Sequence, residues 1–524
     1  MMFRPLARFC GFCGLVLPVL MITNAAQAIT VSFSTAATGS TYAITNWGYD
    51  TAWDDANNEQ RAIIFMGSTN VNIVRVSPAM NSALIGSDLW SATLTNSDQV
   101  IESNLATKTK SLSPNAKWYF CQGAYNNWYR SSTYDVYPDR YAAGFQANVN
   151  YLYALANKPT IWACDFFNEP DYSPNDEGSA ADIFNVLYYM TNNSTCRIFK
   201  MGGLAALNAD VATNWFNPLL PRATLGSTHW LAGSATSYVN FIKRVKNNNC
   251  VCCEPETHNL GECIIGANYG LDASIWWGTA ERARGEFVQA CRNGKRLGYA
   301  EDLTHAVAGA VYRTSSGKIK AFVGGSERDS SDTTVTFTCS NTNCYFDGHG
   351  PQTSYSVTAG ASNDEMVIDI TWGTDHATNF NGTYKIINKN SGLALGVPGS
   401  STSDGTQLDQ ETYTGASNQK WVITPLGRGG DRSYYSIVAA YDSKAANLDS
   451  YSYANGGVIN QYTYYNLAQQ HWYLEYAGSG YYKIHTRWDA KLLEVAGGST
   501  ASGALIDQYD DTGAASQQWS ITSP

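Results

Sequence analysis

Two acidic motifs, each at the end of an apolar run, hold the residues best suited to chemistry. The first reads Asp-Phe-Phe-Asn-Glu-Pro at residues 165–170, and the second reads Glu-Pro-Glu-Thr-His-Asn at residues 254–259. Two carboxylates that a fold brings together can act as a proton donor and as a nucleophile. Glu169 and Glu254 are 85 residues apart, which gives each of three strand–helix units roughly 28 residues, close to the ~30 expected. The motifs are therefore predicted to end the fourth and seventh strands of one parallel sheet.

Eight short apolar or β-branched runs, separated by stretches of helical composition, supply the strands for such a sheet. Eight strands alternating with helices over about 250 residues predict a (β/α)8 or TIM barrel, in which catalytic groups project from the C-terminal strand ends. We assign residues 29–309 to this barrel. The predicted strands are Tyr42–Trp47, Val71–Val76, Lys117–Cys121, Thr160–Phe167, Cys196–Met201, Ala223–Ser227, Cys250–Cys253 and Ala273–Trp277.

Two further domains are expected after the barrel. Residues 310–372 concentrate β-formers between Gly, Ser, Asp and Asn clusters, which predicts a small β-sandwich side domain that a strand at Thr30–Phe33 could complete. Residues 373–382 are predicted to be a linker. In residues 383–524, Gln-x-Trp occurs three times, and its tryptophans, Trp421, Trp472 and Trp519, are 51 and 47 residues apart. This spacing predicts one unit copied three times.

The first 28 residues have the features of an export signal. Arg4 and Arg8 precede the apolar stretch Phe9–Ile22, and Ala26-Gln27-Ala28 supplies small residues for cleavage. The apolar stretch is too short to span a bilayer, and no later run reaches ~18 residues. Residues 1–28 are therefore predicted to be a signal peptide, and the mature chain is expected to be secreted, in an extracellular or periplasmic location.

Composition limits the partners. Without the predicted signal, 32 basic residues face 44 acidic ones, a net charge of −12. Nucleic acid and anionic membranes demand basic patches, so neither is an expected partner. Aromatic residues make up 13% of the chain and can fill cores or form flat platforms for sugar rings. The oligomeric state stays open, with a monomer favoured.

Cysteine usage agrees with export. Ten cysteines remain after the predicted signal, an even number that allows disulfides in an exported chain. Cys339 and Cys344, between two predicted strands, are the expected pair. The cluster Cys250, Cys252 and Cys253 lacks a second cluster at zinc-finger spacing, so no metal site is expected there. No organic cofactor is expected either.

The motif Asn168-Glu169-Pro170 at the end of the fourth strand resembles clan A of the glycoside hydrolases. The resemblance implies that Glu169 is the general acid/base and that Asn168 holds the sugar 2-hydroxyl. It also implies a nucleophilic carboxylate at the end of strand seven. Glu254 directly follows the apolar run and is favoured, while Glu256 is the alternative, because side chains two residues apart share a strand face.

Five more residues, at the ends of three strands, match the clan. Arg75 ends the second strand, where an arginine would hydrogen-bond the nucleophile and keep its pKa low. His229 and Trp230 follow strand six, where the clan carries an aromatic residue or a histidine beside the nucleophile. Trp276 and Trp277 end strand eight, where one tryptophan would form the floor of the sugar subsite and the other would be buried in the core.

The architecture most resembles glycoside hydrolase families 30 and 39. The sandwich after the barrel, the partial strand before it and the motif Asn46-Trp47-Gly48-Tyr49 carry this likeness over about half of the chain. Cys253 replaces the serine that usually precedes the nucleophile, so no substrate is inferred from the families.

The Gln-x-Trp repeats resemble the ricin-type β-trefoil, a sugar-binding module similar to carbohydrate-binding family 13. The resemblance implies that the tryptophans are structural and that an early acid, together with polar or aromatic residues, contacts sugar. The first repeat has Leu395-Gly396 in place of an acid and is expected to be silent. The expected sugar contacts of the other repeats are Asp449, Gln461, Tyr462, Asn466, Glu494, Gln508 and Tyr509.

These observations predict a secreted retaining β-glycosidase that acts on a polysaccharide or oligosaccharide and is targeted by a sugar-binding module. Glu169 would protonate the glycosidic oxygen, and Glu254 or Glu256 would form the covalent intermediate. The alternative is a carbohydrate-binding protein whose barrel has lost activity. A third hypothesis is a ricin-like toxin subunit. The sugar, its linkage and the choice between internal and terminal cleavage are not predicted.

Overall fold

The computed structural model describes residues 27–51, 56–122, 125–131, 135–172, 178–193, 199–326, 331–360 and 363–524. The predicted signal peptide lies outside these residues, except that Gln27 and Ala28 begin the first strand, β1 (Gln27–Phe33). None of the described helices is long and apolar enough to cross a membrane.

Ten strands form one entirely parallel sheet in the order β6-β8-β9-β10-β11-β2-β3-β4-β5-β7. Only Phe166 separates β5 from β6, and two glycines separate β7 from β8, so the two ends of this path belong to the same pair of chain segments and the sheet closes on itself. The strands are β2 (Asn46–Asp50), β3 (Val71–Val76), β4 (Lys117–Cys121), β5 (Ile161–Asp165), β6 (Phe167–Asn168), β7 (Lys200–Met201), β8 (Leu204–Asn208), β9 (Leu225–Ala232), β10 (Val251–Thr257) and β11 (Ala273–Trp276).

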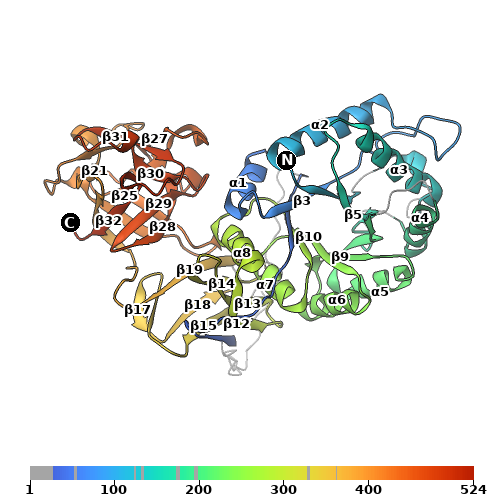
Figure 1. Cartoon of the computed structure of the whole chain (residues 1–524), viewed down its shortest axis with the longest axis horizontal. Coiled ribbons are helices and arrows are strands. Elements are labelled where there is room, and N and C mark those ends of the chain that lie inside the picture. Colours follow the sequence, from blue (N-terminus) through green and yellow to red (C-terminus); the bar gives the residue numbers. More distant parts are fainter. Residues whose placement is uncertain are drawn as a thin grey trace, which may run out of the picture.

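In the described part of the chain, eight helices surround this sheet (Figure 1). Their apolar faces pack on the outer face of the strands in the largest buried cluster of the chain, while a smaller cluster with Ile73, Tyr119 and Leu225 fills the interior of the ring. The helices are α1 (Ala56–Met66), α2 (Asn96–Leu112), α3 (Pro138–Ala154), α4 (Ala180–Asn192), α5 (Ala209–Phe216), α6 (Ala235–Asn247), α7 (Leu260–Tyr269) and α8 (Arg282–Asn293).

The observed strands differ most from the predicted ones at the first and fifth positions of the ring, and β9 and β10 also extend past the predicted ends, to Ala232 and Thr257. The first strand of the parallel sheet, β2, begins at Asn46 rather than at Tyr42. Tyr42 instead packs under Arg296, whose guanidinium carbon lies 3.3 Å from the tyrosine ring centre. The fifth strand is mostly β8, which follows the predicted run Cys196–Met201, part of which lies outside the described residues.

A second β domain follows α8 and begins earlier than predicted. β1, β15 and β18 form one sheet, and β12, β13, β14, β19, β16 and β17 form another, with a buried apolar core between them. β12 and β13 pair with each other in this second sheet, so the predicted boundary at residue 309 is too late. The expected N-terminal strand pairs with β15 in parallel. The strands are β12 (Lys295–Asp302), β13 (Val307–Arg313), β14 (Ile319–Gly324), β15 (Thr333–Cys339), β16 (Cys344–Phe346), β17 (His349–Gln352), β18 (Ser354–Ala359) and β19 (Asp364–Trp372).

Twelve strands of the C-terminal part form a fourth sheet around the buried Trp421, Trp472 and Trp519. Each tryptophan donates its indole N–H to the carbonyl oxygen of the residue 26 positions earlier, at 3.0 to 3.1 Å. The three repeats are therefore built alike. Their strands are β20 (Gly382–Asn388), β21 (Ala394–Gly396), β22 (Asp409–Glu411), β23 (Trp421–Pro425), β25 (Tyr435–Ala439), β26 (Ala445–Leu448), β27 (Gly457–Tyr462), β28 (His471–Gly478), β29 (Tyr481–Thr486), β30 (Leu492–Val495), β31 (Ala504–Tyr509) and β32 (Trp519–Thr522).

The segment predicted as a linker is packed rather than free. Ala377 and Phe380 are buried in the core of the C-terminal part, and Thr378 Oγ1 lies 2.8 Å from the hydroxyl of Tyr482. On the other side, His376 stacks on Tyr345 of β16 at a ring separation of 3.7 Å. The segment is therefore part of the core of the C-terminal part, and it also contacts the second β domain through His376.

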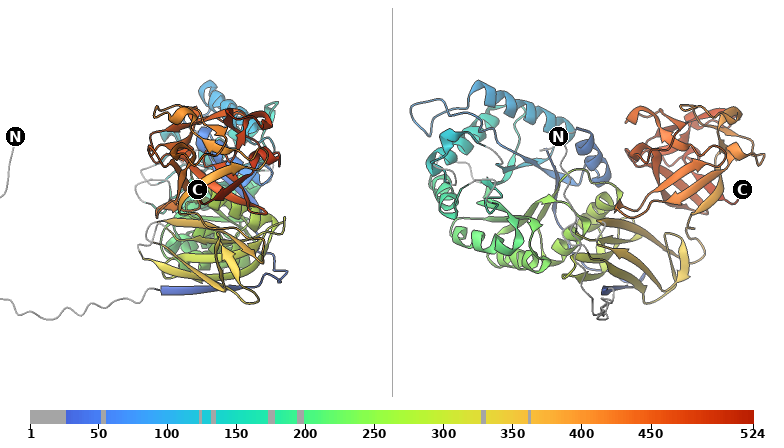
Figure 2. Two further views of the ribbon diagram at one scale, coloured as in Figure 1. Left: turned by 90° about the vertical axis from the view of Figure 1, so that its left-hand side faces the viewer. Right: turned by 180° about the vertical axis from the view of Figure 1, so that it is seen from behind.

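The C-terminal part also contacts the helical ring and the second β domain (Figure 2). Glu281 directly precedes helix α8. It accepts hydrogen bonds from Arg61 of helix α1 and, at 2.6 Å, from Arg487 of the C-terminal part. The short strand β24 (Gly430–Asp431) pairs with β19, and Arg282 donates its backbone N–H to the hydroxyl of Tyr434 at 2.9 Å. These polar contacts are buried or nearly so, and they fix the position of the C-terminal part.

Candidate active site and carbohydrate sites

Glu169, His229 and Glu256 meet at the C-terminal ends of the parallel strands. His229 Nδ1 lies 2.7 Å from Oε1 of Glu169 and 3.5 Å from Oε2 of Glu256. One side-chain atom from each of the three residues lies within 4.8 Å of the other two. Glu169 leaves β6, and its φ of 54° and its N–H bond of 2.8 Å to Ala205 turn the side chain into the ring mouth.

Arg75 organises the other side of the mouth. Its guanidinium donates to Glu256 and, at 2.8 Å, to Asp50, and a third bond of 2.6 Å reaches Oδ1 of Asn168. Burial acts to raise the pKa of Glu256, but Arg75 and then His229 outweigh it, so this pKa lies below its usual value. Glu256 is therefore kept ionised. Asp50, the residue directly after the motif Asn46-Trp47-Gly48-Tyr49, was not singled out in the sequence.

Glu254 faces away from this cluster, which corrects the preference for it as nucleophile. It is fully buried and accepts a 2.7 Å hydrogen bond from Tyr238 of helix α6, on the outer face of the sheet. The pairing of β10 with β11 shifts register between Glu254 and Thr257. Such an irregularity re-aims side chains, so residues two apart lie on opposite faces of the sheet here.

In each of the two sequence pairs, Trp276–Trp277 and His229–Trp230, one residue lies in the site and the other packs in the core. Trp276 is buried and stacks on Trp47 at 6.2 Å, whereas Trp277 stands beside Arg75, with its ring centre 5.9 Å from the guanidinium carbon. Trp230 is also buried and stacks on Tyr238 at 4.3 Å, so it does not join His229 in the site. The expectation that Trp230 contacts substrate is therefore corrected.

A cleft of about 650 Å³ opens in front of Arg75, Glu256 and Trp277. This volume falls in the range of small-molecule sites, and the lining combines an aromatic ring with polar groups that can orient a ligand. The described lining residues are Asp50, Thr51, Arg75, Ser77, Ile101, Asn104, Leu105, Lys108, Asn168, Glu256 and Trp277.

Asp165 lies inside the ring below the site and was not assigned a role from the sequence. It is fully buried and accepts a hydrogen bond from Tyr119. Burial raises the pKa of Asp165 to about 7, although hydrogen bonds from Ser227 and Tyr119 and the charges of His229 and Arg75 oppose this. Its place at the start of the first acidic motif could have marked Asp165 as a site residue. The alternation of side chains along the strand did not show that the interior of the ring holds polar groups.

The ligand types of Glu169, His229 and Glu256 could also hold a divalent metal ion. Two features fit this group poorly. Arg75 already places a guanidinium on Glu256, and His229 presents the same nitrogen, Nδ1, to both carboxylates. The arrangement therefore suits two carboxyl groups bridged by His229 better than it suits a metal centre.

The nine cysteines that the structure describes are free thiols. Cys339 and Cys344, the expected disulfide, lie in opposite sheets of the second β domain and share its core. Burial and the neighbouring Cys339 raise the pKa of the Cys344 thiol to about 12. The prediction of this disulfide is corrected to two adjacent thiols, while Cys196 lies outside the described residues.

The internal symmetry of the C-terminal part corrects the register assumed for its sugar-contacting acids. The tryptophan hydrogen bonds make Leu395, Ala446 and Leu493 equivalent. Glu494 therefore corresponds to Gly396 and Asn447, whereas Asp449 starts a turn at the position of Pro398 and Ala496. Asp449 accepts a 3.2 Å hydrogen bond from Asn460, so it is not equivalent to Glu494.

The first repeat does have an acid at this place. A Cβ atom on Gly396 would lie 3.2 Å from Oε2 of Glu411, so this carboxylate fills the space that a side chain at residue 396 would take. Gln419 donates to it at 3.2 Å, as Gln517 donates to Glu494 at 2.7 Å in the third repeat. The first repeat therefore has a carboxylate at this position, whereas the second repeat has Asn447 there.

A second acid accompanies each of these glutamates. Burial and the neighbouring Glu411 raise the pKa of Asp409 to about 6, and burial and Glu494 do the same for Asp507. The equivalent residue of the second repeat is Asn460, which accepts a 2.9 Å hydrogen bond from Asn447. Repeats one and three are thus acidic, and repeat two is neutral.

Gln461, Gln508 and Asn466 have structural roles. Both glutamines are fully buried, and each donates to backbone carbonyls of a neighbouring repeat, at 2.6 Å to Ser401 and 2.9 Å to Ser452. Asn466 has a φ of 59° and takes the turn position that Gly415 and Gly513 occupy in the other repeats. The expectation that Gln461 and Gln508 contact sugar is corrected, whereas Asn466, Tyr462 and Tyr509 are exposed and can face a ligand.

Comparison with known protein families gives a match in the C-terminal part of the chain. A family model described as ricin-type beta-trefoil lectin domain-like matches residues 369–462 and 468–524. None of the curated proteins matches the chain.

Similar solved structures cover limited parts of the chain. The designed threefold-symmetric protein ThreeFoil is 38% identical over 28% of this chain and 100% of its own, with a TM-score of 0.26. An exo-beta-1,3-galactanase from Clostridium thermocellum is 22% identical over 43% of this chain and 57% of its own, with a TM-score of 0.26. A ricin B-like lectin from Macrolepiota procera, in complex with lactose, is 18% identical over 28% and 99%, with a TM-score of 0.25. The family match and the threefold arrangement of strands identify the C-terminal part of this chain as a ricin-type β-trefoil lectin domain, a carbohydrate-binding module.

Proposed function

We propose that the chain is a secreted retaining β-glycosidase whose catalytic domain is a (β/α)8 barrel of the clan A type and whose lectin domain holds the enzyme on its polysaccharide. The observation that carries this proposal is the approach of Glu169 and Glu256 on either side of His229, within 4.8 Å. Retaining glycosidases hold their two carboxyl groups about 5–5.5 Å apart, whereas inverting enzymes leave room for a water between them.

The surroundings give the two carboxylates different roles. Glu256 is kept ionised by Arg75 and suits attack on the anomeric carbon. Glu169 lies 2.7 Å from Nδ1 of His229 and directly follows Asn168, whose carbonyl oxygen Arg75 holds. A carboxyl group at this position, across His229 from Glu256, suits proton transfer to the departing glycosidic oxygen. The C–O bond to the leaving group breaks as the glycosyl–Glu256 ester forms. Glu169, now ionised, then takes a proton from water, which displaces Glu256 and gives the product with its configuration retained.

The neighbours of the pair suit sugar binding. Trp277 offers a flat apolar surface for the C–H face of a pyranose, and Asn168 has its carbonyl oxygen bound to Arg75. The amide nitrogen of Asn168 is thereby oriented toward the cleft side, where it can donate to a sugar hydroxyl. Asp50 supports Arg75 from the opposite side at 2.8 Å.

The test is release of reducing ends from a panel of xylan, laminarin, arabinogalactan and fungal and algal polysaccharides. The full chain should hydrolyse at least one of them, with unchanged activity after treatment with a metal chelator. The matched control is the double variant Glu169→Gln, Glu256→Gln. If the parent is no faster than this control on every substrate, the catalytic proposal fails and a carbohydrate-binding protein with an inactive barrel remains, because the family match lies in the lectin domain.

A further inference from the structure

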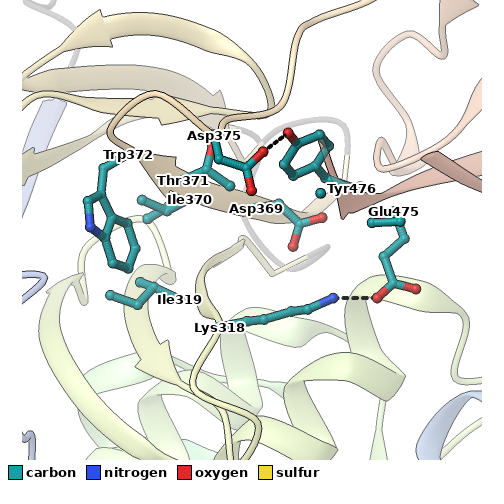
Figure 3. A pocket seen from close by; sticks show the side chains of 11 residues that line it. Lys318, Ile319, Asp369, Ile370, Thr371, Trp372, Asp375, Glu475 and Tyr476 are labelled. Atoms are coloured by element: carbon teal, nitrogen blue, oxygen red, sulfur yellow. Dashed lines mark hydrogen bonds and ion pairs between the residues drawn. The ribbon is translucent and has the colours of Figure 1, made fainter. Parts of the chain in front are cut away.

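A cavity of about 360 Å³ lies at the seam between the second β domain and the lectin domain. Its walls come from the start of β14, the end of β19 and the segment after it, and the end of β28 (Figure 3). No residue of the catalytic cleft or of the acidic sites in repeats one and three lines it. Its volume is within the range of pockets that hold small ligands.

Trp372 forms one wall of this cavity. It is the one exposed tryptophan in the described part of the chain, with 39% of its surface accessible. Figure 3 shows its indole ring beside Ile319, which is buried, so the aromatic ring is supported from within the sheet. A rigid indole that presents an apolar face to solvent is suited to stacking on the C–H face of a sugar ring.

The facing wall supplies hydrogen-bonding groups in fixed positions. The hydroxyl of Tyr476 and the backbone N–H of Ser479, the latter at 2.9 Å, both donate to Oδ1 of Asp375. Asp375 is thus anchored through one oxygen, and its other oxygen can accept from a ligand hydroxyl. At the lower edge of the view, Lys318 reaches from the second β domain to Glu475 of the lectin domain (Figure 3).

The charges of the cavity are mostly paired. Lys318 is bound to Glu475, and Asp369 is bound to Lys320 at 2.7 Å. A strongly charged ligand would have to break these pairs, whereas a neutral polyol can donate to the carboxylates and accept from the ammonium group. An aromatic wall opposite fixed acceptors therefore favours an uncharged sugar over an ionic ligand.

We propose that this seam cavity is an additional carbohydrate site, which binds one neutral pyranose of a polysaccharide between Trp372 and Asp375. The assignment of the ligand class rests on the proposed function. The two walls are held together by the pairing of β24 with β19 and by the packed segment at residues 373–382, so the site is preformed and little ordering opposes binding. A chain seated here is held at a fixed position relative to the catalytic cleft.

The test uses the full chain with the acidic lectin sites weakened by Glu411→Gln and Glu494→Gln, so that the seam dominates binding. Affinity electrophoresis in gels with xylan, laminarin or arabinogalactan measures the dissociation constant. Trp372→Ala should weaken binding about 5-fold or more, the range that loss of one aromatic contact gives, and Trp372→Phe should retain most of it. Asp375→Asn, which removes the acceptor charge, should also weaken binding.

The matched control is Tyr188→Ala, which truncates a ring of similar exposure, 44%, on helix α4. It should bind like the parent, and all variants should hydrolyse a small aryl glycoside at the parental rate. Equal retardation of Trp372→Ala, Asp375→Asn and their parent in every gel would overturn the proposal, as would an absence of retardation in all of them. Binding that depends on Trp372 in a chain that hydrolyses nothing would instead reject the glycosidase and leave the seam site standing.

Discussion

Glu254 and Glu256 are two residues apart on β10 and yet lie on opposite sides of the sheet. Glu254 is held by Tyr238 at 2.7 Å behind the strands, while Glu256 is held by Arg75 at the mouth. The register shift between Glu254 and Thr257 produces this reversal. It also decides which glutamate lines the cleft.

The first prediction compares these two residues. Glu256→Gln should lower kcat by about 10³-fold or more, because the amide cannot form the glycosyl ester. Glu254→Gln should change kcat by less than about 10-fold, since it perturbs only a buried hydrogen bond behind the strand, and it should lower the melting temperature instead. Peptide mapping after trapping with a 2-fluoro glycoside should place the label on Glu256. A label on Glu254 would contradict the geometry.

Much of the fold was predictable from periodicity and spacing, and the site only in part. The runs at 71–76 and 117–121 became strands with the predicted bounds, because continuous β-branched and aromatic residues between helical segments leave few alternatives. The side to which a residue points was less predictable. A register shift at Glu254 is a tertiary feature, and no local pattern marks it.

The same limit applies to the lectin repeats. Counting from Leu-Asp or Leu-Glu placed Asp449 with Glu494, but the repeats differ in length between the acid and the tryptophan. The register between the repeats follows from the indole hydrogen bond, because each tryptophan donates to the carbonyl oxygen of the residue 26 positions earlier. Glu411 could not be found by alignment, because its carboxylate reaches the position of Gly396 from another strand.

The second prediction concerns Glu169. Glu169→Gln should slow hydrolysis of natural polysaccharide by about 10²–10⁴-fold, whereas activated aryl glycosides should lose much less, because their leaving groups need little protonation. Proton NMR of the first product of the parent should show a retained anomeric configuration. An inverted first product, or a variant equally slow on both substrate types, would remove Glu169 from the acid role.

The third prediction concerns pH and Asp165. Its pKa is raised to about 7 in the folded chain, so the folded state binds the proton more tightly than the unfolded state. The contribution of Asp165 to the free energy of unfolding is therefore fully present below about pH 4. It falls as pH rises toward 7, by on the order of 4 kcal/mol. Asp165→Asn should remove this dependence. Calorimetric melting at pH 4 and pH 8 should show a smaller pH difference for the variant than for the parent; equal differences would contradict the prediction.

The fourth prediction concerns removal of the lectin domain. The packed segment at 373–382 argues against a clean separation near Asn379, because truncation strips Arg487 from Glu281 and Tyr434 from Arg282. A chain ending at Trp372 should therefore be poorly soluble or melt at a clearly lower temperature than the parent. Arg487→Ala should cost about 1.5–3 kcal/mol, because Glu281 loses one of its two guanidinium partners and keeps Arg61.

The control for this interface is Lys483→Ala, whose partner Asp511 has 46% of its side chain exposed. Such a surface pair should contribute at most about 1 kcal/mol. Chemical unfolding of the two variants gives the comparison. Equal stability of Arg487→Ala and Lys483→Ala, together with a truncated chain that melts like the parent, would show that the domains are independent.

The last prediction concerns the lectin repeats. Glu411 and Glu494 are each held by the glutamine of their Gln-x-Trp motif, and each has an acidic neighbour, Asp409 or Asp507. Ionised carboxylates that accept hydroxyl hydrogen bonds form the stronger class of such bonds, so Glu411→Gln and Glu494→Gln should each weaken binding to polysaccharide about 3- to 10-fold. Asp449→Ala should have little effect, because its repeat is neutral at the equivalent positions. Isothermal titration with the polysaccharide that the parent binds best provides the measurement, and circular dichroism checks folding. Parental affinity for Glu411→Gln with a loss for Asp449→Ala would reverse the assignment of repeats one and two.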